Sequence, residues 1–216
     1  MTKGALFDLD GVIVDTAKYH YIAWRELAQR LGFDFTEIDN ERLKGVSRMA
    51  SLDILLEVGG RQNDFSDEEK LQMATEKNDN YVRLISRMTP DEVLPGAVTF
   101  LNNLRSAGIK IALGSASKNA MTILDNLGLT PLFDAIIDGN KVSKAKPDPE
   151  VFLKGAEALG LQPQECVVFE DASAGLDAAI AGGMKCVGIG SPDTLNKANL
   201  VINGLNEMSV EKLLKL

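Results

Sequence analysis

Residues 104–115 read LRSAGIKIALGS, in which a helix-like stretch ends on a glycine and an unbroken apolar run follows directly. The same succession occurs three more times, at residues 124–137, 156–169 and 179–190. Glycine readily adopts the left-handed conformation that closes a helix, and continuous Val, Ile, Leu and Ala runs suit strands covered on both faces. This alternation predicts an α/β fold with a doubly wound, parallel, Rossmann-like sheet.

Two further segments complete the predicted sheet: GALFD at 4–8 as its first strand and LVING at 200–204 as a late edge strand. Residues 15–87 interrupt the alternation, because they contain helical patterns and no convincing strand. The predicted helices there span 18–31, 48–58 and 66–87. We therefore predict an α/β core domain of residues 1–14 and 88–216, into which a helical domain of residues 15–87 is inserted.

The composition is that of an ordinary globular protein, with 216 residues, 45% apolar, 25% charged and a net charge of -8. Lys and Arg number 23 against 31 Asp and Glu, without a basic block, so neither nucleic acid nor a membrane is expected as a partner. The chain lacks an apolar run of about 18 residues and a signal-like N-terminal stretch, which predicts a cytoplasmic location. Cys166 and Cys186 lie in apolar segments and are predicted to be free core thiols; a monomer is expected.

Two acids end the first predicted strand. Asp8 and Asp10 are two positions apart, and in an extended chain such residues face the same side. Ligands of doubly wound sheets bind beyond the carboxyl ends of the strands, so both carboxylates can point into one pocket. Two acids placed together are costly unless a cation joins them.

The other strand ends supply complementary groups. They are a hydroxyl at Ser115, an ammonium at Lys146 and two carboxylates at Glu170 and Asp171. Carboxylate oxygens are ligands for a hard divalent cation such as Mg²⁺, while hydroxyl and ammonium groups suit a phosphate. The set predicts a Mg²⁺ site beside a phosphoryl group, with Asp8 as the nucleophile and Lys146 opposite the metal.

Each of these pieces also has an ordinary structural explanation. An Asp-x-Asp at a strand end often belongs to a turn, Ser115 and the Glu170-Asp171 pair can cap helices, and Lys146 can be a solvated lysine. The segment GNKVSKAKPDP contains two further lysines, Lys141 and Lys144, and only its position before a proline selects Lys146. A site is favoured because four independent pieces fall at the expected strand ends.

These residues resemble the four motifs of the haloacid dehalogenase superfamily of phosphoryl-transfer enzymes. The matching stretches, in order, are Asp8-Leu-Asp10-Gly-Val-Ile, Ser115, Lys146-Pro147 and Glu170-Asp171-Ala-Ser-Ala-Gly175. The resemblance implies a phosphoryl acceptor at Asp8, a general acid and base at Asp10, and phosphate stabilisers at Ser115 and Lys146. It also implies Mg²⁺ held by Asp8, the Asp10 carbonyl, Glu170 and Asp171, and a helical cap over the site formed by residues 15–87.

Within this superfamily, the inserted segment and one loop of the core resemble the β-phosphoglucomutase family. The similar stretches are residues 43–48, 77–81 and 115–119, together with Asp15-Thr16, His20 and Trp24. The resemblance implies that Arg48 and its preceding backbone hold the distal phosphate of a sugar, that Ser117 to Asn119 help to clamp it, and that Lys77 and Asn78 lie near the sugar. The predicted substrate-binding set is Thr16, His20, Trp24, Lys44, Gly45, Val46, Ser47, Arg48, Lys77, Asn78, Ala116, Ser117, Lys118 and Asn119.

Some members of this set have a competing interpretation. His20 and Trp24 recur at helical spacing with Leu27 and Leu31, so both can be packing residues instead of lining a site. Lys77 is equally open to both interpretations.

The resemblance predicts a Mg²⁺-dependent phosphomutase that acts on a small phosphorylated sugar. It would interconvert β-D-glucose 1-phosphate and D-glucose 6-phosphate through an aspartyl-phosphate enzyme and a bisphosphate. The alternative is a sugar-phosphate phosphatase on the same scaffold. A third possibility, a non-catalytic phospho-accepting regulator, would need neither Asp10 near the nucleophile nor an inserted domain with its own arginine.

Overall fold

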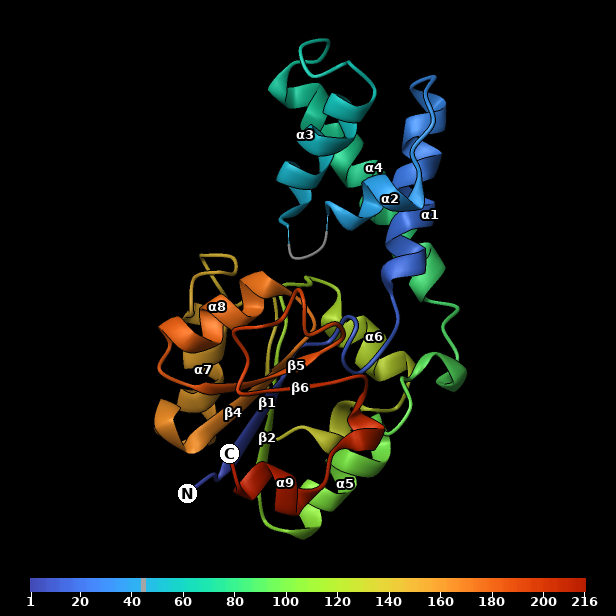
Figure 1. The fold of residues 1–216 in the computed structure, drawn as a ribbon. Coiled ribbons are helices and arrows are strands. Elements are labelled where there is room, and N and C mark those ends of the chain that lie inside the picture. Colours follow the sequence, from blue (N-terminus) through green and yellow to red (C-terminus); the bar gives the residue numbers. More distant parts are fainter. Residues whose placement is uncertain (44–45) are drawn as a thin grey trace. The chain divides into compact units, whose positions relative to one another are not determined.

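The computed structural model describes residues 1–43 and 46–216 (Figure 1). Lys44 and Gly45, two of the predicted substrate-binding residues, lie outside the described residues. The chain divides into two compact units, one made of residues 1–15 and 88–216 and the other of residues 16–87. The predicted helical insertion began one residue earlier.

The larger unit is built on a six-stranded sheet in which every neighbouring pair is parallel. Its strands are β1 (Gly4–Phe7), β2 (Lys110–Gly114), β3 (Ala135–Ile137), β4 (Cys166–Glu170), β5 (Lys185–Ile189) and β6 (Leu200–Ile202). The order β3-β2-β1-β4-β5-β6 confirms the predicted doubly wound sheet and places β6 at an edge. The strand predicted within residues 129–137 begins late, because Thr130–Leu132 with Pro131 forms a 3₁₀ turn.

Helices alternate with these strands as predicted. They are α5 (Ala97–Ser106), α6 (Ala120–Asn126), α7 (Glu150–Leu159), α8 (Ser173–Ala181) and α9 (Val210–Leu214), with 3₁₀ turns at Pro90–Glu92, Thr130–Leu132, Pro163–Glu165 and Leu205–Glu207. The glycines that precede the apolar runs, Gly108, Gly128, Gly160 and Gly183, all have positive φ. At Gly160 the left-handed residue directly ends α7, the role that the sequence pattern assigned to it.

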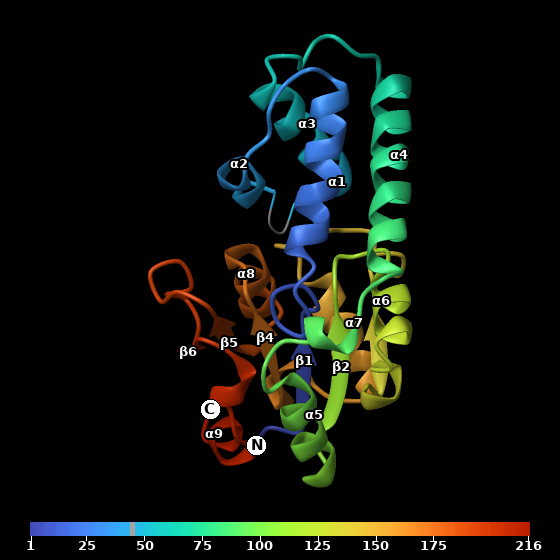
Figure 2. The same ribbon diagram turned by 90° about the vertical axis from the view of Figure 1, so that its right-hand side faces the viewer.

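Both faces of the sheet are covered, which explains why its strands are apolar without alternation. Leu6 packs with Phe152 of α7 and Leu176 of α8 in one buried cluster. The next residue, Phe7, points the other way and stacks on Phe169 with ring centroids 4.6 Å apart. Figure 1 shows α7 on one side of the sheet and α5 on the other, and in Figure 2 α5 lies in front of the strands. Burying each such side chain contributes roughly 1.5–3 kcal/mol.

The strand order reverses beside β1, whose neighbours are β2 and β4. Crossovers to either side of such a point leave a crevice beyond the carboxyl ends of the strands. Asp8 follows β1 at this position, and its backbone N–H donates to the carbonyl of Phe169, 3.0 Å away, so the ladder continues to the nucleophile candidate. The topology therefore brings the ends of β1 and β4 together.

Helices make up the smaller unit: α1 (Ala17–Arg30), α2 (Glu37–Glu41), α3 (Arg48–Val58) and α4 (Asp67–Ile85). No strand occurs among its described residues. Its separate core includes Leu27, Phe35, Leu52 and Leu56. The short α2 was not predicted, although a reciprocal capping box between Thr36 and Asp39 opens it. The helix predicted at 66–87 starts after its cap Ser66 and ends at Ile85.

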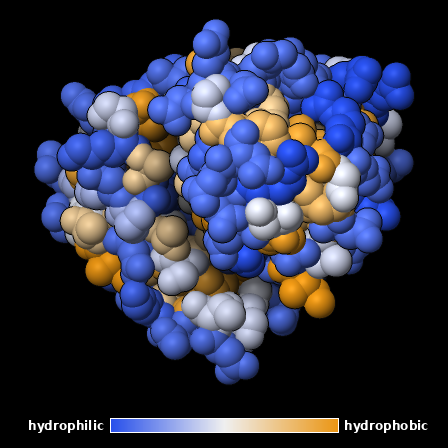
Figure 3. Space-filling model, turned by 90° about the horizontal axis from the view of Figure 1, so that it is seen from above, coloured by the Kyte–Doolittle hydropathy of each residue, from blue (hydrophilic) through white to orange (hydrophobic). Residues whose placement is uncertain are grey.

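The remaining global features concern thiols and surface. Cys166 and Cys186 are free and buried, as predicted. Among the described residues, no helix combines the length and the apolar character that a membrane crossing requires. On the face drawn in Figure 3, hydrophilic residues predominate and apolar ones form separate patches, as is ordinary for globular proteins.

Candidate active site

Lys146 joins two acids at the carboxyl ends of β1 and β4. Its ammonium Nζ lies 2.7 Å from Asp8 Oδ1 and 2.6 Å from Glu170 Oε1, and all three side chains are buried. Burial lowers the pKa of Lys146, but the carboxylates of Asp8 and Glu170 outweigh it and hold that pKa above its ordinary value. The lysine therefore stays protonated and offsets part of the negative charge of the buried acids.

The other two lysines of the same segment face elsewhere. Lys141 Nζ donates to the carbonyl of Ile136 at 2.6 Å, and Lys144 Nζ pairs with Asp148 at 3.3 Å. The structure thus places Lys146, and neither Lys141 nor Lys144, beside Asp8. The Lys146-Pro147 peptide bond is cis.

Three carboxylates form a compact oxygen cluster at this end of the sheet. One oxygen each from Asp8, Glu170 and Asp171 lies within 4.8 Å of the others. Two glycines make room for them: a Cβ on Gly11, whose φ is 75°, would overlap the Asp171 carboxylate, and one on Gly175 would overlap that of Glu170. A set of hard oxygen donors in a cradle of this kind fits a hard divalent cation such as Mg²⁺.

Asp10 has a pKa well above that of an ordinary carboxyl group. Burial, and then the neighbouring Asp8 carboxylate, raise the pKa of Asp10 to about 7. Near neutral pH the group is therefore present in both forms. A carboxyl that must give a proton in one step and take one in another works best with such a pKa.

Ser115 begins the loop that leads from β2 into α6. Its side chain is fully buried, and its N–H donates to the carbonyl of Ile137 at 2.9 Å. The Ser117 N–H donates to the Ser115 hydroxyl at 3.1 Å, and the Asn119 N–H donates to the Ser117 hydroxyl at 3.2 Å. These bonds fold residues 115–119 back on themselves, while Ala116 and Lys118 stay exposed.

In the helical unit, a second group of predicted residues comes together around Lys77. The buried Nζ of Lys77 lies 2.9 Å from His20 Nδ1 and 4.4 Å from the centre of a Trp24 ring. His20 also stacks on Tyr81, with ring centroids 4.0 Å apart. Burial, and then Lys77 and Arg48, hold the pKa of His20 well below its ordinary value. His20 is therefore neutral, with Nδ1 able to accept a hydrogen bond from Lys77.

Arg48 and Asn78 form a third group in the helical unit. Arg48 Nη2 donates to Asn78 Oδ1 at 2.7 Å. Ser47 caps α3 by accepting a hydrogen bond from the Ala50 N–H at 3.4 Å, and Val46 is exposed. Thr16, the first residue of this unit, is fully buried.

Sequence reasoning missed three residues that support these loops: Asp138, Asn140 and Glu150. Asn140 Nδ2 donates to the carbonyl of Lys118 at 2.9 Å and to Asp138 Oδ2 at 3.1 Å, which ties the turn after β3 to the loop after β2. Glu150 binds the segment that carries Lys146. The available signals were the Asp-Gly-Asn turn at 138–140 and an acid in the first turn of a helix.

The haloacid dehalogenase-like hydrolase family model matches residues 2–183, so the chain belongs to this family, as its four motifs predicted. It is 41% identical over 211 residues to the β-phosphoglucomutase of Bacillus subtilis (strain 168), covering 98% of this chain and 93% of that protein. The crystal structure of a β-phosphoglucomutase from Clostridium difficile is 48% identical, with a TM-score of 0.93 and coverage of 100% and 96%. Hexitol phosphatase A of Escherichia coli (strain K12) is 32% identical, covering 97% and 94%.

Proposed function

We propose that this chain is a Mg²⁺-dependent phosphomutase that interconverts β-D-glucose 1-phosphate and D-glucose 6-phosphate. One observation carries the chemistry: a buried Asp8 contacts Lys146 within a cluster of acids at the switch point of the sheet. The sugar assignment rests on similarity to β-phosphoglucomutases over nearly the whole of both chains.

The metal is proposed from the same donor set. The carboxylates of Asp8, Glu170 and Asp171 would hold Mg²⁺, and the family pattern adds the backbone carbonyl of Asp10. When bound, Mg²⁺ neutralises charge on the phosphoryl group so that an anionic nucleophile can approach it. Lys146 has a similar electrostatic role, because its ammonium contacts the same Asp8 carboxylate.

In the first half-reaction, the enzyme carries a phosphoryl group on Asp8. Asp10 takes the proton of the sugar's C6 hydroxyl as that oxygen attacks phosphorus, and the bond between phosphorus and the Asp8 oxygen breaks. The products are a free Asp8 carboxylate, a protonated Asp10 and glucose 1,6-bisphosphate.

In the second half-reaction, the bisphosphate presents its other phosphate to Asp8. An Asp8 oxygen attacks that phosphorus, the bond from phosphorus to the C1 oxygen breaks, and the leaving oxygen takes the proton from Asp10. Glucose 6-phosphate and the phosphorylated Asp8 result. Ser115 and Lys146 stabilise the transferring group in both directions, and the pKa of Asp10 suits both of its roles.

The phosphate that is not reacting needs its own cation, because the bisphosphate must bind in two orientations. We assign this task to Arg48 with the backbone at Gly45 to Ser47, assisted by Ser117, Lys118 and Asn119. The remaining predicted groups, Thr16, His20, Trp24, Lys77 and Asn78, are proposed for the sugar. The helical unit, residues 16–87, is thus proposed to carry groups for the sugar and its distal phosphate.

Phosphorus NMR on β-glucose 1-phosphate with Mg²⁺ and a trace of glucose 1,6-bisphosphate tests the proposal. Appearance of glucose 6-phosphate supports a mutase. Release of inorganic phosphate alone would instead support a phosphatase, the activity named for the Escherichia coli relative. An unchanged spectrum would contradict both enzymatic assignments. The α anomer of glucose 1-phosphate is the matched control and should not react.

A further inference from the structure

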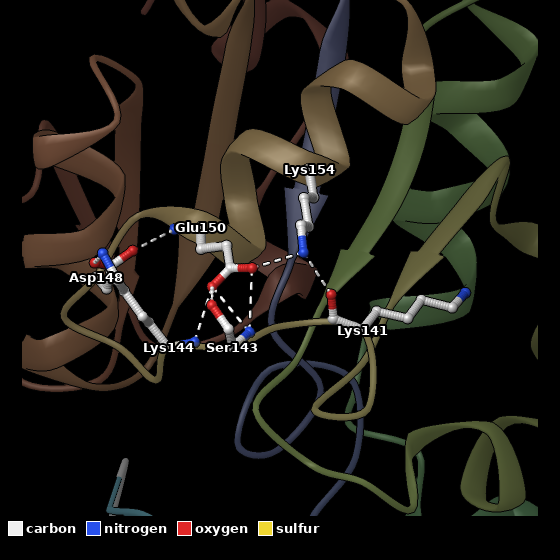
Figure 4. Close-up of polar contacts among 6 residues, drawn as sticks. All are labelled: Lys141, Ser143, Lys144, Asp148, Glu150 and Lys154. Atoms are coloured by element: carbon white, nitrogen blue, oxygen red, sulfur yellow. Dashed lines mark hydrogen bonds and ion pairs between the residues drawn. The ribbon is translucent and has the colours of Figure 1, made fainter.

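Glu150, the first residue of α7, holds the segment that leads to Lys146 (Figure 4). Its carboxylate accepts hydrogen bonds from the Ser143 N–H at 2.9 Å, the Ser143 hydroxyl at 2.9 Å and the Lys144 N–H at 2.8 Å. It also accepts a bond from Lys154 Nζ, one helical turn later, at 2.6 Å. One side chain therefore satisfies two consecutive backbone amides of the preceding loop.

The neighbours of Glu150 attach the same loop at further points. Lys154 Nζ also donates to the carbonyl of Lys141 at 2.7 Å. On the other side, Asp148 Oδ1 accepts from the Glu150 N–H at 3.0 Å, and Asp148 pairs with Lys144. Figure 4 shows these side chains converging on the start of α7. The loop is thus tied to α7 both before and after residue 146.

The charge of Glu150 strengthens this arrangement. Its side chain is 17% exposed. The hydrogen bond from Lys154, and then those from Ser143, lower the pKa of Glu150 to about 2. The carboxylate is therefore ionised throughout the neutral range, and hydrogen bonds to an ionised acceptor are the stronger kind.

The functional lysine lies within the part of the chain that these contacts fix. Residues 138–149 contain no helix or strand, so no ladder sets the direction of Lys146. Lys144, whose N–H binds Glu150, is two residues before it, and Asp148 is two residues after it. The Nζ of Lys146 must nevertheless reach both Asp8 and Glu170 at hydrogen-bonding distance.

We propose that Glu150 is a positioning residue for phosphoryl transfer: by binding the Ser143 and Lys144 amides it sets the loop from which Lys146 reaches Asp8. The inference rests on the proposed function and adds a residue outside the four motifs. Glu150 does not touch the reacting atoms, and its whole effect passes through Lys146.

A double-mutant cycle with Lys146 tests this dependence. Glu150→Ala is expected to lower kcat by about 10- to 100-fold with little change in KM, because displacements near 1 Å cost rates of that order. In a Lys146→Ala background the same change should have an effect below about 2-fold. Lys154→Met, which leaves both backbone amides bound, should lower kcat less than Glu150→Ala. Glu157→Ala, an exposed acid on the same helix, is the matched control and should be unchanged.

A second measurement does not depend on turnover. The ε-methylene NMR signal of Lys146, assigned with Lys146→Arg, should move toward the position of solvated lysines in Glu150→Ala and stay in place in Glu157→Ala. Equal losses of kcat in both backgrounds, or an unmoved Lys146 signal, would overturn the positioning role. If the wild-type protein had no mutase activity while the Lys146 signal still moved in Glu150→Ala, the proposed function alone would be refuted.

Discussion

The two units of the molecule assemble their candidate groups in different ways. In the α/β unit, opposite charges meet at strand ends, where Lys146 contacts Asp8 and Glu170. In the helical unit, the cations contact neutral groups: Lys77 meets His20 Nδ1, and Arg48 donates to Asn78 Oδ1. The first arrangement pairs one ammonium with two carboxylates beside Asp171, which leaves negative charge for a divalent cation, and suits the reaction proposed at Asp8. The second places a lysine and an arginine beside neutral hydrogen-bond partners, with the Asp79 carboxylate acting on Arg48, and we propose it for the anionic ligand.

The largest expected effect concerns the chemical step that this comparison assigns to the α/β unit. Asp8→Asn should reduce mutase turnover on the order of 10⁴-fold or more, because an amide does not accept the phosphoryl group. The fold should persist, since Lys146 keeps its contact with Glu170 and the repulsion among the acids decreases. Steady-state rates and urea unfolding measure the two quantities.

Asp193→Asn, an exposed acid in the same unit, is the control for loss of one negative charge. Near-wild-type turnover in Asp8→Asn would contradict the assignment of Asp8 as the nucleophile. The chemical contrast between the two units would then also be wrong.

A smaller loss is expected at Asp10, which separates proton transfer from metal binding. Asp10→Asn should lower sugar turnover by roughly 10²- to 10⁴-fold, the range typical for loss of a general acid or base. Mg²⁺ affinity should remain, because the proposed ligand at this residue is the backbone carbonyl. Isothermal titration with Mg²⁺ and mutase assays on the same variant check both statements. Loss of Mg²⁺ binding would show that the Asp10 side chain serves the metal instead.

A third change tests the task given to the helical unit. Arg48→Ala should lower kcat/KM for glucose 1-phosphate by roughly 10- to 150-fold, the value of a hydrogen bond to a charged group. Phosphorylation of Asp8 by acetyl phosphate should decrease far less, because that donor has no second phosphate. Both reactions should be followed with one enzyme preparation, so that differences in folded protein concentration cancel.

Arg42→Ala supplies the control, since Arg42 is an exposed arginine of the same unit that pairs with Glu57 at 3.1 Å. Equal losses with both phosphoryl donors in Arg48→Ala would place Arg48 in the fold or in the core chemistry.

The two units also differ in how much of their structure could be predicted from the sequence. In the α/β unit, a repeated helix-strand alternation predicts a parallel sheet, and the sheet then brings Asp8 and Glu170 together without further information. The rule works because strand ends of one sheet share an edge. It fails where local chemistry intervenes, as at β3, whose start Pro131 delays.

No comparable rule exists for a helical bundle. The contact of Lys77 with His20 joins positions 57 residues apart and depends on how α1 packs against α4, which helical periodicity alone does not specify. The five-residue α2 is too short to show an apolar period. Glu150 was missed for another reason: an acid in the first turn of a helix already has an ordinary explanation in the helix dipole.

The smallest expected effect is a pH dependence of stability in the helical unit. His20 is the single histidine of the chain, and its folded pKa lies well below the ordinary value near 6.5 because of burial and the adjacent Lys77 and Arg48. Below about pH 6.5 the unfolded chain therefore gains a proton that the folded unit does not take up. The His20 contribution to stability should fall as the pH decreases from 7 toward 5, by at most about 1.4 kcal/mol per pH unit.

Two features of the sequence make this decrease measurable. Trp24, the single tryptophan, lies in the same cluster and reports urea unfolding of the helical unit by fluorescence, and the single imidazole gives an unambiguous NMR titration. In His20→Gln the amide oxygen can still accept from Lys77, but the proton-linked decrease between pH 7 and 5 should disappear. Carboxylates such as Glu69, with pKa values lowered by Ser66, lose their contribution only at more acidic pH. Burial raises the pKa values of Asp10 and Glu170 in the α/β unit, so these groups act with the opposite sign, and the His20 contribution is the difference between the pH profiles of wild type and His20→Gln. If the imidazole titrated near pH 6.5 in the folded protein, Lys77 and His20 would not share a buried cluster. Lys77 would then have no neutral histidine as its partner, and the contrast with the α/β unit would not hold.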